Sequence, residues 1–241
     1  MVVTLDQVVY ATAQEIVWRN EPSLKNVLAR LGSFHTSMVF MAVIGKRFAD
    51  AGLPVVLPES EIVSSGSVDG VIKGKHYNRA IRAHKTVAEA LLRMQWRLFE
   101  GWLDEKTPAN VDLAALSSML KRLRSESSAH SAEVLVESGS FKALHKSHQQ
   151  FSNRDYALMA TFWQSYIDMV MLLLRFVRAT REGNWKIHLE SIRAMIPWLF
   201  AYDHVNYARY LSIYWCEMMS LPSTHPDAHT LPVRVMSTLS G

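Results

Sequence analysis

Two polar residues, Asp6 and His35, follow apolar runs of the sequence at places where phosphate or metal-ion chemistry often occurs. Asp6 directly follows the β-branched run at residues 2–5, and His35 stands shortly after the run at residues 26–31. Both runs are typical of strands, and each precedes apolar residues at helical spacing. In parallel α/β sheets, ligand-binding groups project into a crevice at the carboxyl ends of the strands. We therefore expect Asp6 and His35 to lie at such a crevice.

Each of these two residues also has a plainer interpretation. The Asp6 carboxylate could hold Mg²⁺ through its oxygens, but Asp6 also stands where a helix N-cap accepts backbone N–H groups, and the residues alone favour the cap. His35 could meet an anion or a metal-bound oxygen from the first turn of the next helix. On its own it is more typical of a partly buried, hydrogen-bonded histidine.

A third segment, residues 198–210, combines aromatic side chains with Asp203, Asn206 and Arg209. Asn206 and Arg209 are three residues apart and therefore share one face of the predicted helix. Glu217 stands about two helical turns further on and could share that face. Asp203 is either a helix N-cap or an acidic ligand that faces the crevice. The aromatic rings are more typical of a core than of a surface on which bases stack.

The composition places these residues in a folded, soluble chain. Of the 241 residues, 49% are hydrophobic and 20% are charged, which excludes a disordered protein. The single cysteine excludes an intramolecular disulfide framework and favours a reducing compartment. The start of the sequence does not resemble a signal peptide, and the most apolar stretch, residues 166–177, is shorter than the roughly 20 residues of a spanning helix. We expect an intracellular protein without a membrane partner, with the nucleus as one candidate location.

The predicted fold class is mainly α, with a small N-terminal parallel α/β unit followed by a large helical domain. Glycine and proline are scarce, and this favours long helices over many short strands. The expected domains are the α/β unit at residues 1–75, the helical domain at residues 76–222, and a disordered tail at residues 223–241.

The sequence also predicts secondary structure within these domains. Residues 55–63 are predicted to add a strand, residues 125–140 to be partly loop, and Pro197 to kink or break a helix. The expected helices after residue 75 are 76–104, 111–123, 155–181, 185–202 and 207–221.

The net charge of +4 is concentrated in one part of the chain. Residues 73–124 contain eleven Lys and Arg side chains against five Asp and Glu side chains. This pattern permits a basic stripe for a phosphate backbone, although a solvated helix face is the commoner reason for such a run. The stripe would consist of Lys73, Lys75, Arg79, Arg82, Lys85, Arg93 and Arg97.

Three motifs together resemble an uncharacterised family associated with multicopy, mobile-element-like genes of marine invertebrates and fish. They are VTLDQVVY at residues 3–10, LGSFHT at residues 31–36 and YDHVNYARY at residues 202–210. GSVD at residues 66–69, GKHYNR at residues 74–79 and GNW at residues 183–185 also resemble this family. The resemblance covers about residues 3–227 and brings no established function.

More distantly, the order of elements resembles the central part of RNase H-like transposases of the Mutator and hAT kinds. Asp6 is similar to their second acidic residue, and Gly32-x-x-His35 to their Cys-x-x-His or Asp-x-x-His element. Asp203-x-x-Asn206 is similar to the Glu-x-x-Asn of Mutator-type enzymes, and Glu217 is the other candidate for the third acid. The helices of residues 76–200 correspond to the insertion.

The transposase resemblance implies two-metal phosphoryl transfer. In that chemistry, carboxylates hold two Mg²⁺ ions that activate a water or a 3′-hydroxyl and stabilise the leaving oxygen. Asp6, Asp203 and Glu217 would be the Mg²⁺ ligands, and His35 would join them as a catalytic residue. The first catalytic aspartate, the first strands of the sheet and a domain that binds DNA ends are expected upstream and have no counterpart in this sequence.

The leading hypothesis is therefore a truncated or domesticated transposase-like protein with an RNase H-like remnant. It would bind DNA through the basic helix and lack strand-transfer activity. A rival hypothesis is a helical interaction or scaffold protein with no nucleic-acid role, which would bind a partner or form a homo-oligomer through the apolar helix at residues 155–181. A weaker alternative is a Mg²⁺-dependent nuclease built on Asp6, Asp203 and Glu217.

Overall fold

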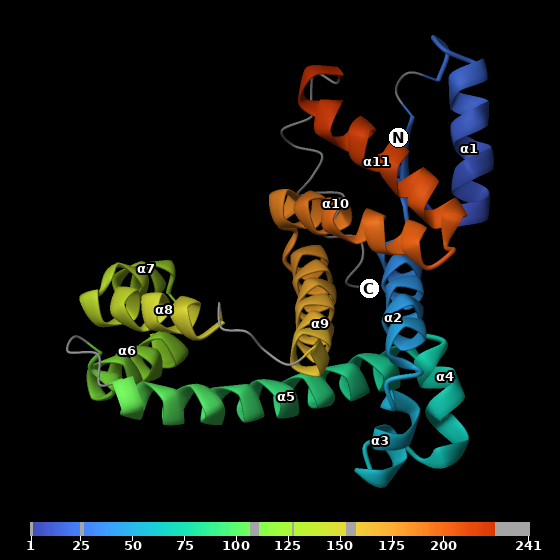
Figure 1. Cartoon of the computed structure of the whole chain (residues 1–241). Helices are drawn as coiled ribbons and strands as arrows, with labels where there is room; N and C mark the ends of the chain where they lie inside the picture. Colours follow the sequence, from blue (N-terminus) through green and yellow to red (C-terminus); the bar gives the residue numbers. More distant parts are fainter. Residues whose placement is uncertain (1, 25–26, 107–110, 127, 153–157, 225–241) are drawn as a thin grey trace. The chain divides into compact units, whose positions relative to one another are not determined.

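The computed structural model describes residues 2–24, 27–106, 111–126, 128–152 and 158–224 (Figure 1). Within these residues it contains eleven α-helices, one short 3-10 helix and one pair of parallel strands. The predicted fold class, mainly α with a small N-terminal parallel unit, is confirmed. Among the described helices, none is long and apolar enough to cross a membrane.

The chain forms two compact units. The first contains residues 1–88 and 164–241, and the second contains residues 89–163. This division differs from the boundary expected at residue 75, because the C-terminal helices pack with the N-terminal α/β segment. Of the expected disordered tail, residues 225–241 lie outside the described residues, whereas residues 223 and 224 end the last helix.

The first unit begins with a strand, a helix, a second strand and a second helix, as the sequence predicts. Its elements are β1 (Val2–Leu5), α1 (Gln7–Arg19), β2 (Leu28–Leu31), α2 (Ser33–Phe48), α3 (Leu53–Glu59), η1 (Ser65–Ser67), α4 (Val68–Ile72), the start of α5 (Tyr77–Lys106), most of α9 (Leu158–Glu182), α10 (Trp185–Ala201) and α11 (Val205–Thr224).

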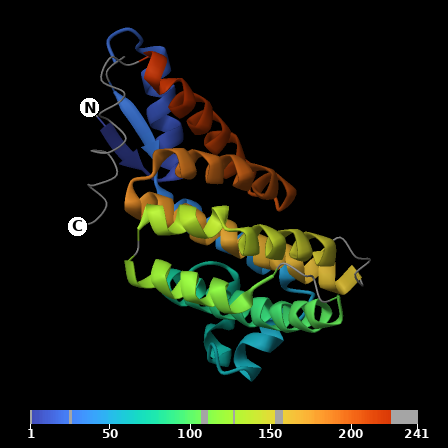
Figure 2. The same ribbon diagram turned by 90° about the vertical axis from the view of Figure 1, so that its left-hand side faces the viewer.

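The two strands pair in parallel along their whole length. Val2 lies opposite Leu28, and Leu5 lies opposite Leu31. Because α1 is the crossover between them, both strands end at the same edge, and the chain leaves that edge twice into a helix. The helices α1 and α11 lie beside the strand pair (Figure 2), and β2 is buried along its whole length.

Arg30 joins β2 to the C-terminal helices. It is buried in the middle of the strand, and its guanidinium carbon lies 5.6 Å from the centre of the Trp185 ring on α10. This geometry allows a cation–π interaction, which strengthens when water is excluded. Burial, with Arg30 nearby, lowers the pKa of His188 to about 3, so this buried histidine is neutral at physiological pH.

The apolar core of the first unit surrounds α2 and α9. On α2, Phe40, Met41 and Phe48 are fully buried, and the Phe48 ring meets Tyr166 of α9 edge-on at 4.9 Å. On α1, the buried Tyr10 ring packs edge-on against two tyrosines of α11 at 6.1 and 6.3 Å. Residues 200 or more positions apart in the sequence therefore share one core.

The second unit has a smaller aromatic core. It contains the rest of α5, α6 (Leu113–Glu126), α7 (Ala129–Glu137), α8 (Gly139–Ser152) and the start of α9. Phe99 and Leu103 of α5 are buried against Phe151 of α8, and Trp102 and Leu144 pack around them. The rings of Phe99 and Phe151 lie 5.3 Å apart.

The strand predicted at residues 55–63 is wrong, because this stretch contains the helix α3. Gly52 precedes α3 in a left-handed conformation (φ 94°), and Pro54 occupies its first turn. Proline suits a helix start, since its missing N–H has no partner there in any case. Leu53 and Leu57, one turn apart, are both buried, which gives α3 one apolar face.

The loop expected within residues 125–140 is short: among the described residues of this stretch, only Ser128 and Ser138 lie outside a helix. Ser128 caps α7 by accepting the backbone N–H of Ser131, and after Ser138 the chain continues directly into α8. Serine is a strong N-cap, so each of these serines separates two helices and starts the second one. Pro197 lies inside α10, and the helix continues through it to Ala201.

The close packing of α2 on α4 yields a stability prediction at Gly45. A Cβ atom at Gly45 would overlap the backbone carbonyl of Ile72. We expect Gly45→Ala to lower the free energy of unfolding by about 1–3 kcal/mol, the usual cost of overpacking. The matched control is Gly101→Ala in α5, where an added Cβ meets no atom within 4 Å and alanine suits the helix better. Urea denaturation followed by circular dichroism measures both, and equal effects would contradict the packing described.

Candidate functional site

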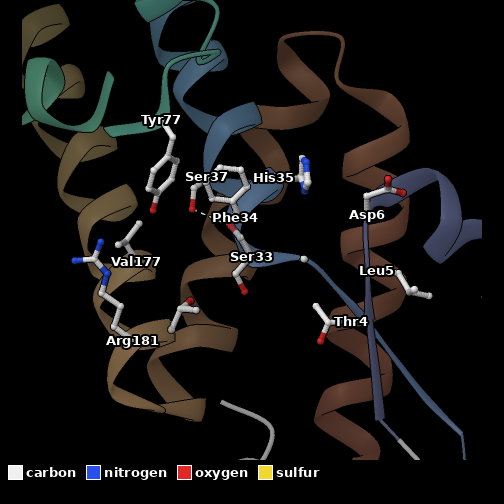
Figure 3. A pocket seen from close by; sticks show the side chains of 12 residues that line it. Thr4, Leu5, Asp6, Ser33, Phe34, His35, Ser37, Tyr77, Val177 and Arg181 are labelled. Carbon is white, nitrogen blue, oxygen red and sulfur yellow. Dashed lines mark hydrogen bonds between the residues drawn. The ribbon is translucent and has the colours of Figure 1, made fainter. Parts of the chain in front are cut away.

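A pocket of about 360 Å³ lies at the carboxyl ends of the two strands (Figure 3). It is formed by the end of β1, the first turn of α2, the start of α5 and the last turns of α9. The lining residues are Thr4, Leu5, Asp6, Gly32, Ser33, Phe34, His35, Ser37, Tyr77, Val177, Thr180 and Arg181. Asp6 and His35 therefore share one crevice, as the sequence predicts.

Gly32 determines the shape of the pocket floor. Its N–H donates to the carbonyl of Leu5 at 2.8 Å, which joins the end of β2 to the end of β1. A Cβ atom at Gly32 would lie 3.2 Å from that carbonyl oxygen, a closer contact than side chains normally make. Glycine thus permits the close approach of the two strand ends. It also leaves α2 without a side-chain cap.

The uncapped start of α2 is the electropositive part of the pocket. The first N–H groups of a helix have no partner within the helix, and the helix dipole places partial positive charge beside them. Here they belong to Ser33, Phe34 and His35. Ser33 is only 8% exposed as a residue, and its hydroxyl has no hydrogen-bond partner among the described residues. By contrast, the Ser37 hydroxyl is already used, because it donates to the Ser33 carbonyl at 2.9 Å.

Arg181 adds a full positive charge to the pocket. It belongs to the last turn of α9 and makes no ion pair with any described residue, whereas Arg178, one turn earlier, pairs with Glu182 at 2.7 Å. Next to Arg181, the Thr180 hydroxyl donates to the Phe176 carbonyl, so it is not free. A guanidinium without a carboxylate partner near a helix N-terminus is suited to an anion.

Two aromatic rings form the wall nearest the start of α2. The Phe34 and Tyr77 rings are 4.6 Å apart and inclined by 42°. The His35 ring meets Phe34 edge-on at 5.4 Å. Phe34 is 52% exposed although it is apolar, so it presents a large ring surface to the solvent.

Asp6 is an N-cap, as its simpler interpretation predicts. Its side chain accepts the backbone N–H of Val9 at 2.9 Å at the start of α1. The carboxylate lies on the side of the pocket opposite Tyr77 and Arg181 (Figure 3). The pocket therefore has one basic side and one acidic side.

Asp203 lies outside the pocket and has a structural role. It follows Tyr202, the C-cap of α10, with a left-handed backbone (φ 65°), and the next N–H, of His204, returns to the Leu199 carbonyl at 2.9 Å. This is the common way to end a helix, so Asp203 ends α10 and is not the N-cap of α11. Its carboxylate pairs with Lys46 at 2.9 Å, and that hydrogen bond and charge lower the pKa of Asp203.

Glu217 also lies outside the pocket. It accepts hydrogen bonds from the Tyr10 hydroxyl at 3.3 Å and from the Gln14 side-chain amide. Burial raises the pKa of Glu217, and the hydrogen bonds from Gln14, Trp18 and Tyr10 offset part of this effect. The residue thus joins α11 to α1 inside the fold.

The carboxylates therefore do not form the metal site that the transposase resemblance implied. Within the described residues, no three His, Cys, Asp or Glu side chains gather where they could hold a metal ion. Asp6, Asp203 and Glu217 are each held by a different group, respectively the start of α1, Lys46 and the Tyr10–Gln14 pair. The geometry supports no Mg²⁺ site on these three residues.

The other predicted binding residues are exposed. Asn206 and Arg209 lie on the surface of α11 near its start, outside the pocket. All seven basic residues of the predicted stripe are exposed, but Lys73 pairs with Asp69 and Arg93 with Glu89, both at 2.7 Å. Lys73, Lys75, Arg79, Arg82 and Lys85 belong to the first unit, and Arg93 and Arg97 to the second.

Sequence reasoning missed Tyr77 and Arg181 as pocket residues. Neither stands in a recognisable motif with His35, since Tyr77 begins a long helix and Arg181 ends another. In the structure Gly32 holds the cap position, and Ser33 is the first residue of the helix.

The chain belongs to a family described as a domain of unknown function (DUF8702), whose model matches residues 1–233. No curated protein and no solved structure matched the chain.

Glu217 provides a pH prediction. Its raised pKa means that the folded protein holds this proton more tightly than the unfolded chain does. Stability therefore falls as the pH rises from the ordinary carboxyl pKa through the raised one, and it stays lower above that. We expect Glu217→Gln, which keeps the size and the acceptor oxygen, to remove this fall, so the variant gains stability over wild type as the pH rises. Urea denaturation of both proteins at pH values from about 4 to about 8 tests this. If the difference in free energy of unfolding between the variant and wild type does not change with pH, the prediction is contradicted.

Asp203 provides a backbone prediction. Its left-handed conformation suits glycine and strains alanine. Both Asp203→Gly and Asp203→Ala remove the Lys46 pair, which is exposed and contributes little. We expect the alanine variant to be less stable than the glycine variant by about 1 kcal/mol. Equal stabilities of the two variants in chemical denaturation would show that the backbone at residue 203 is not strained.

Proposed function

We propose that this protein binds nucleic acid and that one phosphate of the strand occupies the pocket at the start of α2. The observation that carries the proposal is the group of unused donors in that pocket. The Ser33 hydroxyl and the Arg181 guanidinium, neither hydrogen-bonded nor ion-paired among the described residues, line the same pocket as the free N–H groups of an uncapped helix. Such a combination is suited to a phosphate group.

The surface next to the pocket supports a polyanion as the ligand. Tyr77 lines the pocket, and the exposed Lys75 and Arg79 stand two residues before and after it in the sequence. Exposed cations near a phosphate site attract the neighbouring phosphates of a strand and make the affinity depend on salt. Arg82 and Lys85, also exposed, follow on the same helix α5.

The proposal assigns binding to this chain and no phosphoryl transfer. Two-metal transfer needs carboxylates that converge on the metal ions. Asp6, Asp203 and Glu217 instead engage three separate partners. The proposal keeps the nucleic-acid ligand and the mobile-element origin that the sequence resemblance suggested, and the nuclear location is part of the same proposal.

A salt series tests this function. We expect labelled DNA to bind at low salt, with a logarithmic affinity that falls linearly with the logarithm of the salt concentration. Arg181→Gln should weaken binding about tenfold, the effect of losing one charged hydrogen bond. Arg178→Gln is the matched control, because Arg178 lies one turn away on the same helix, pairs with Glu182 and does not line the pocket. Absence of binding at low salt, or binding without a salt slope, would refute the proposal.

A second candidate function is self-association through the second unit. Leu92 and Trp96 on α5 are exposed apolar side chains that line a shallow groove of about 440 Å³. Exposed apolar clusters of this kind are common at protein interfaces. Size-exclusion chromatography with light scattering distinguishes this candidate: a defined oligomer with no affinity for DNA would favour it.

A further inference from the structure

We infer that the pocket receives one unpaired nucleotide, whose phosphate meets the start of α2 and whose base lies against Phe34 and Tyr77. The inference rests on the proposed function, since it takes the strand as the ligand and specifies which form of the strand the pocket accepts. Paired bases are stacked inside a duplex and cannot reach a side-chain ring. The protein would therefore prefer single strands or strand ends to duplex.

The phosphate end rests on two independent features. The first is the uncapped N-terminus of α2, a helix of 16 residues. The second is Ser33, a pocket residue that is more than nine-tenths buried and whose hydroxyl has no partner among the described residues. This hydroxyl is free to donate a hydrogen bond to a ligand in the pocket. Arg181 supplies the charge at this end.

The base end rests on the exposure of Phe34. The Phe34 ring is 52% exposed and belongs to the same helix start as the free N–H groups. It therefore suits a ligand that combines a phosphate with a flat, apolar base. Stacking of a base on an aromatic side chain is a standard, sequence-tolerant contact with single strands. Because Phe34 and Tyr77 already touch at 4.6 Å, the base lies against the outside of the pair and does not enter between the rings.

The volume and charge of the pocket limit the ligand. A volume of about 360 Å³ is at the lower end of the roughly 300–1,000 Å³ of small-molecule sites, so it suits one nucleotide. The Asp6 carboxylate on the opposite side repels additional phosphates of a polyphosphate. These features favour a nucleoside monophosphate unit. The exposed Lys75 and Arg79 favour such a unit within a strand over a free one.

The experiment compares one labelled oligonucleotide as a single strand and as a blunt duplex, with the full chain at fixed salt. We expect the single strand to bind more tightly. Phe34→Leu should weaken single-strand binding about fivefold or more, the effect of losing one stacked base, and leave duplex binding unchanged. Phe34→Tyr should restore it, because it keeps the ring. The matched control is Phe200→Leu, an equally exposed phenylalanine of the first unit outside the pocket (47% exposed).

A second pair of variants tests the phosphate end. Ser33→Ala should weaken single-strand binding without loss of stability, because its hydroxyl makes no hydrogen bond to any described residue. Ser191→Ala, a buried serine outside the pocket whose hydroxyl donates to the Ile187 carbonyl at 2.7 Å, should not weaken binding. If Ser33→Ala has no larger effect on single-strand binding than Ser191→Ala, the assignment of the phosphate to this end is refuted.

The outcomes separate this inference from the proposed function. If no nucleic acid binds, the proposed function fails, and the inference fails with it. If DNA binds in an Arg181-dependent way but Phe34→Leu behaves like Phe200→Leu, or the duplex binds as well as the single strand, the function stands and the inference is overturned.

Competition with thymidine monophosphate identifies the source of the nucleotide. If the free nucleotide displaces the strand and inorganic phosphate does not, the base contact is supported. If the free nucleotide binds and the strand does not, the proposed function is overturned.

Discussion

The pairing of β1 with β2 in parallel is the constraint on which the candidate site depends. Parallel pairing ends both strands at one edge, so the helices that follow them start side by side. The hydrogen bond from the Gly32 N–H to the Leu5 carbonyl draws these two starts together. The same edge therefore holds the start of α1, capped by an acidic side chain, and the start of α2, which is uncapped and electropositive. The chemistry of the pocket follows from this difference between the two helix N-termini.

The C-terminal helices complete what the strand pair begins. Two strands cannot bury both of their faces, and β2 is buried because α1 and α11 lie beside it. Arg30 on β2 lies over the Trp185 ring of α10, and Tyr10 of α1 is enclosed by tyrosines of α11. The first unit is thus closed by segments from opposite ends of the sequence. For that reason Arg181, at the end of α9, reaches a pocket that begins with residue 4.

Asp203 and Glu217 have structural roles, although their order in the sequence resembles that of catalytic acids. Asp203 occupies a left-handed position after a helix, and Glu217 is half-buried against Tyr10 and Gln14. Each location satisfies the carboxylate with a group already present in the fold, so neither is available at the crevice. A motif order that resembles a catalytic triad is therefore compatible with a protein in which all three acids stabilise the structure.

Local signals in the sequence determined the order of strand, helix, strand and helix, the cap at Asp6, the long helix after residue 76 and the crevice shared by Asp6 and His35. Propensity, capping and apolar periodicity act over a few residues, so they can be read without the fold. They failed at residues 55–63, where Pro54 starts a helix among β-branched residues. At residues 125–140 they did not show how short the breaks between helices are, because serines there cap the helices. Only the tertiary structure decided that Tyr77 and Arg181 line one pocket with Ser33, and that Asp203 and Glu217 lie outside it. Those outcomes depend on how helices distant in sequence pack, and packing leaves no local periodic signal.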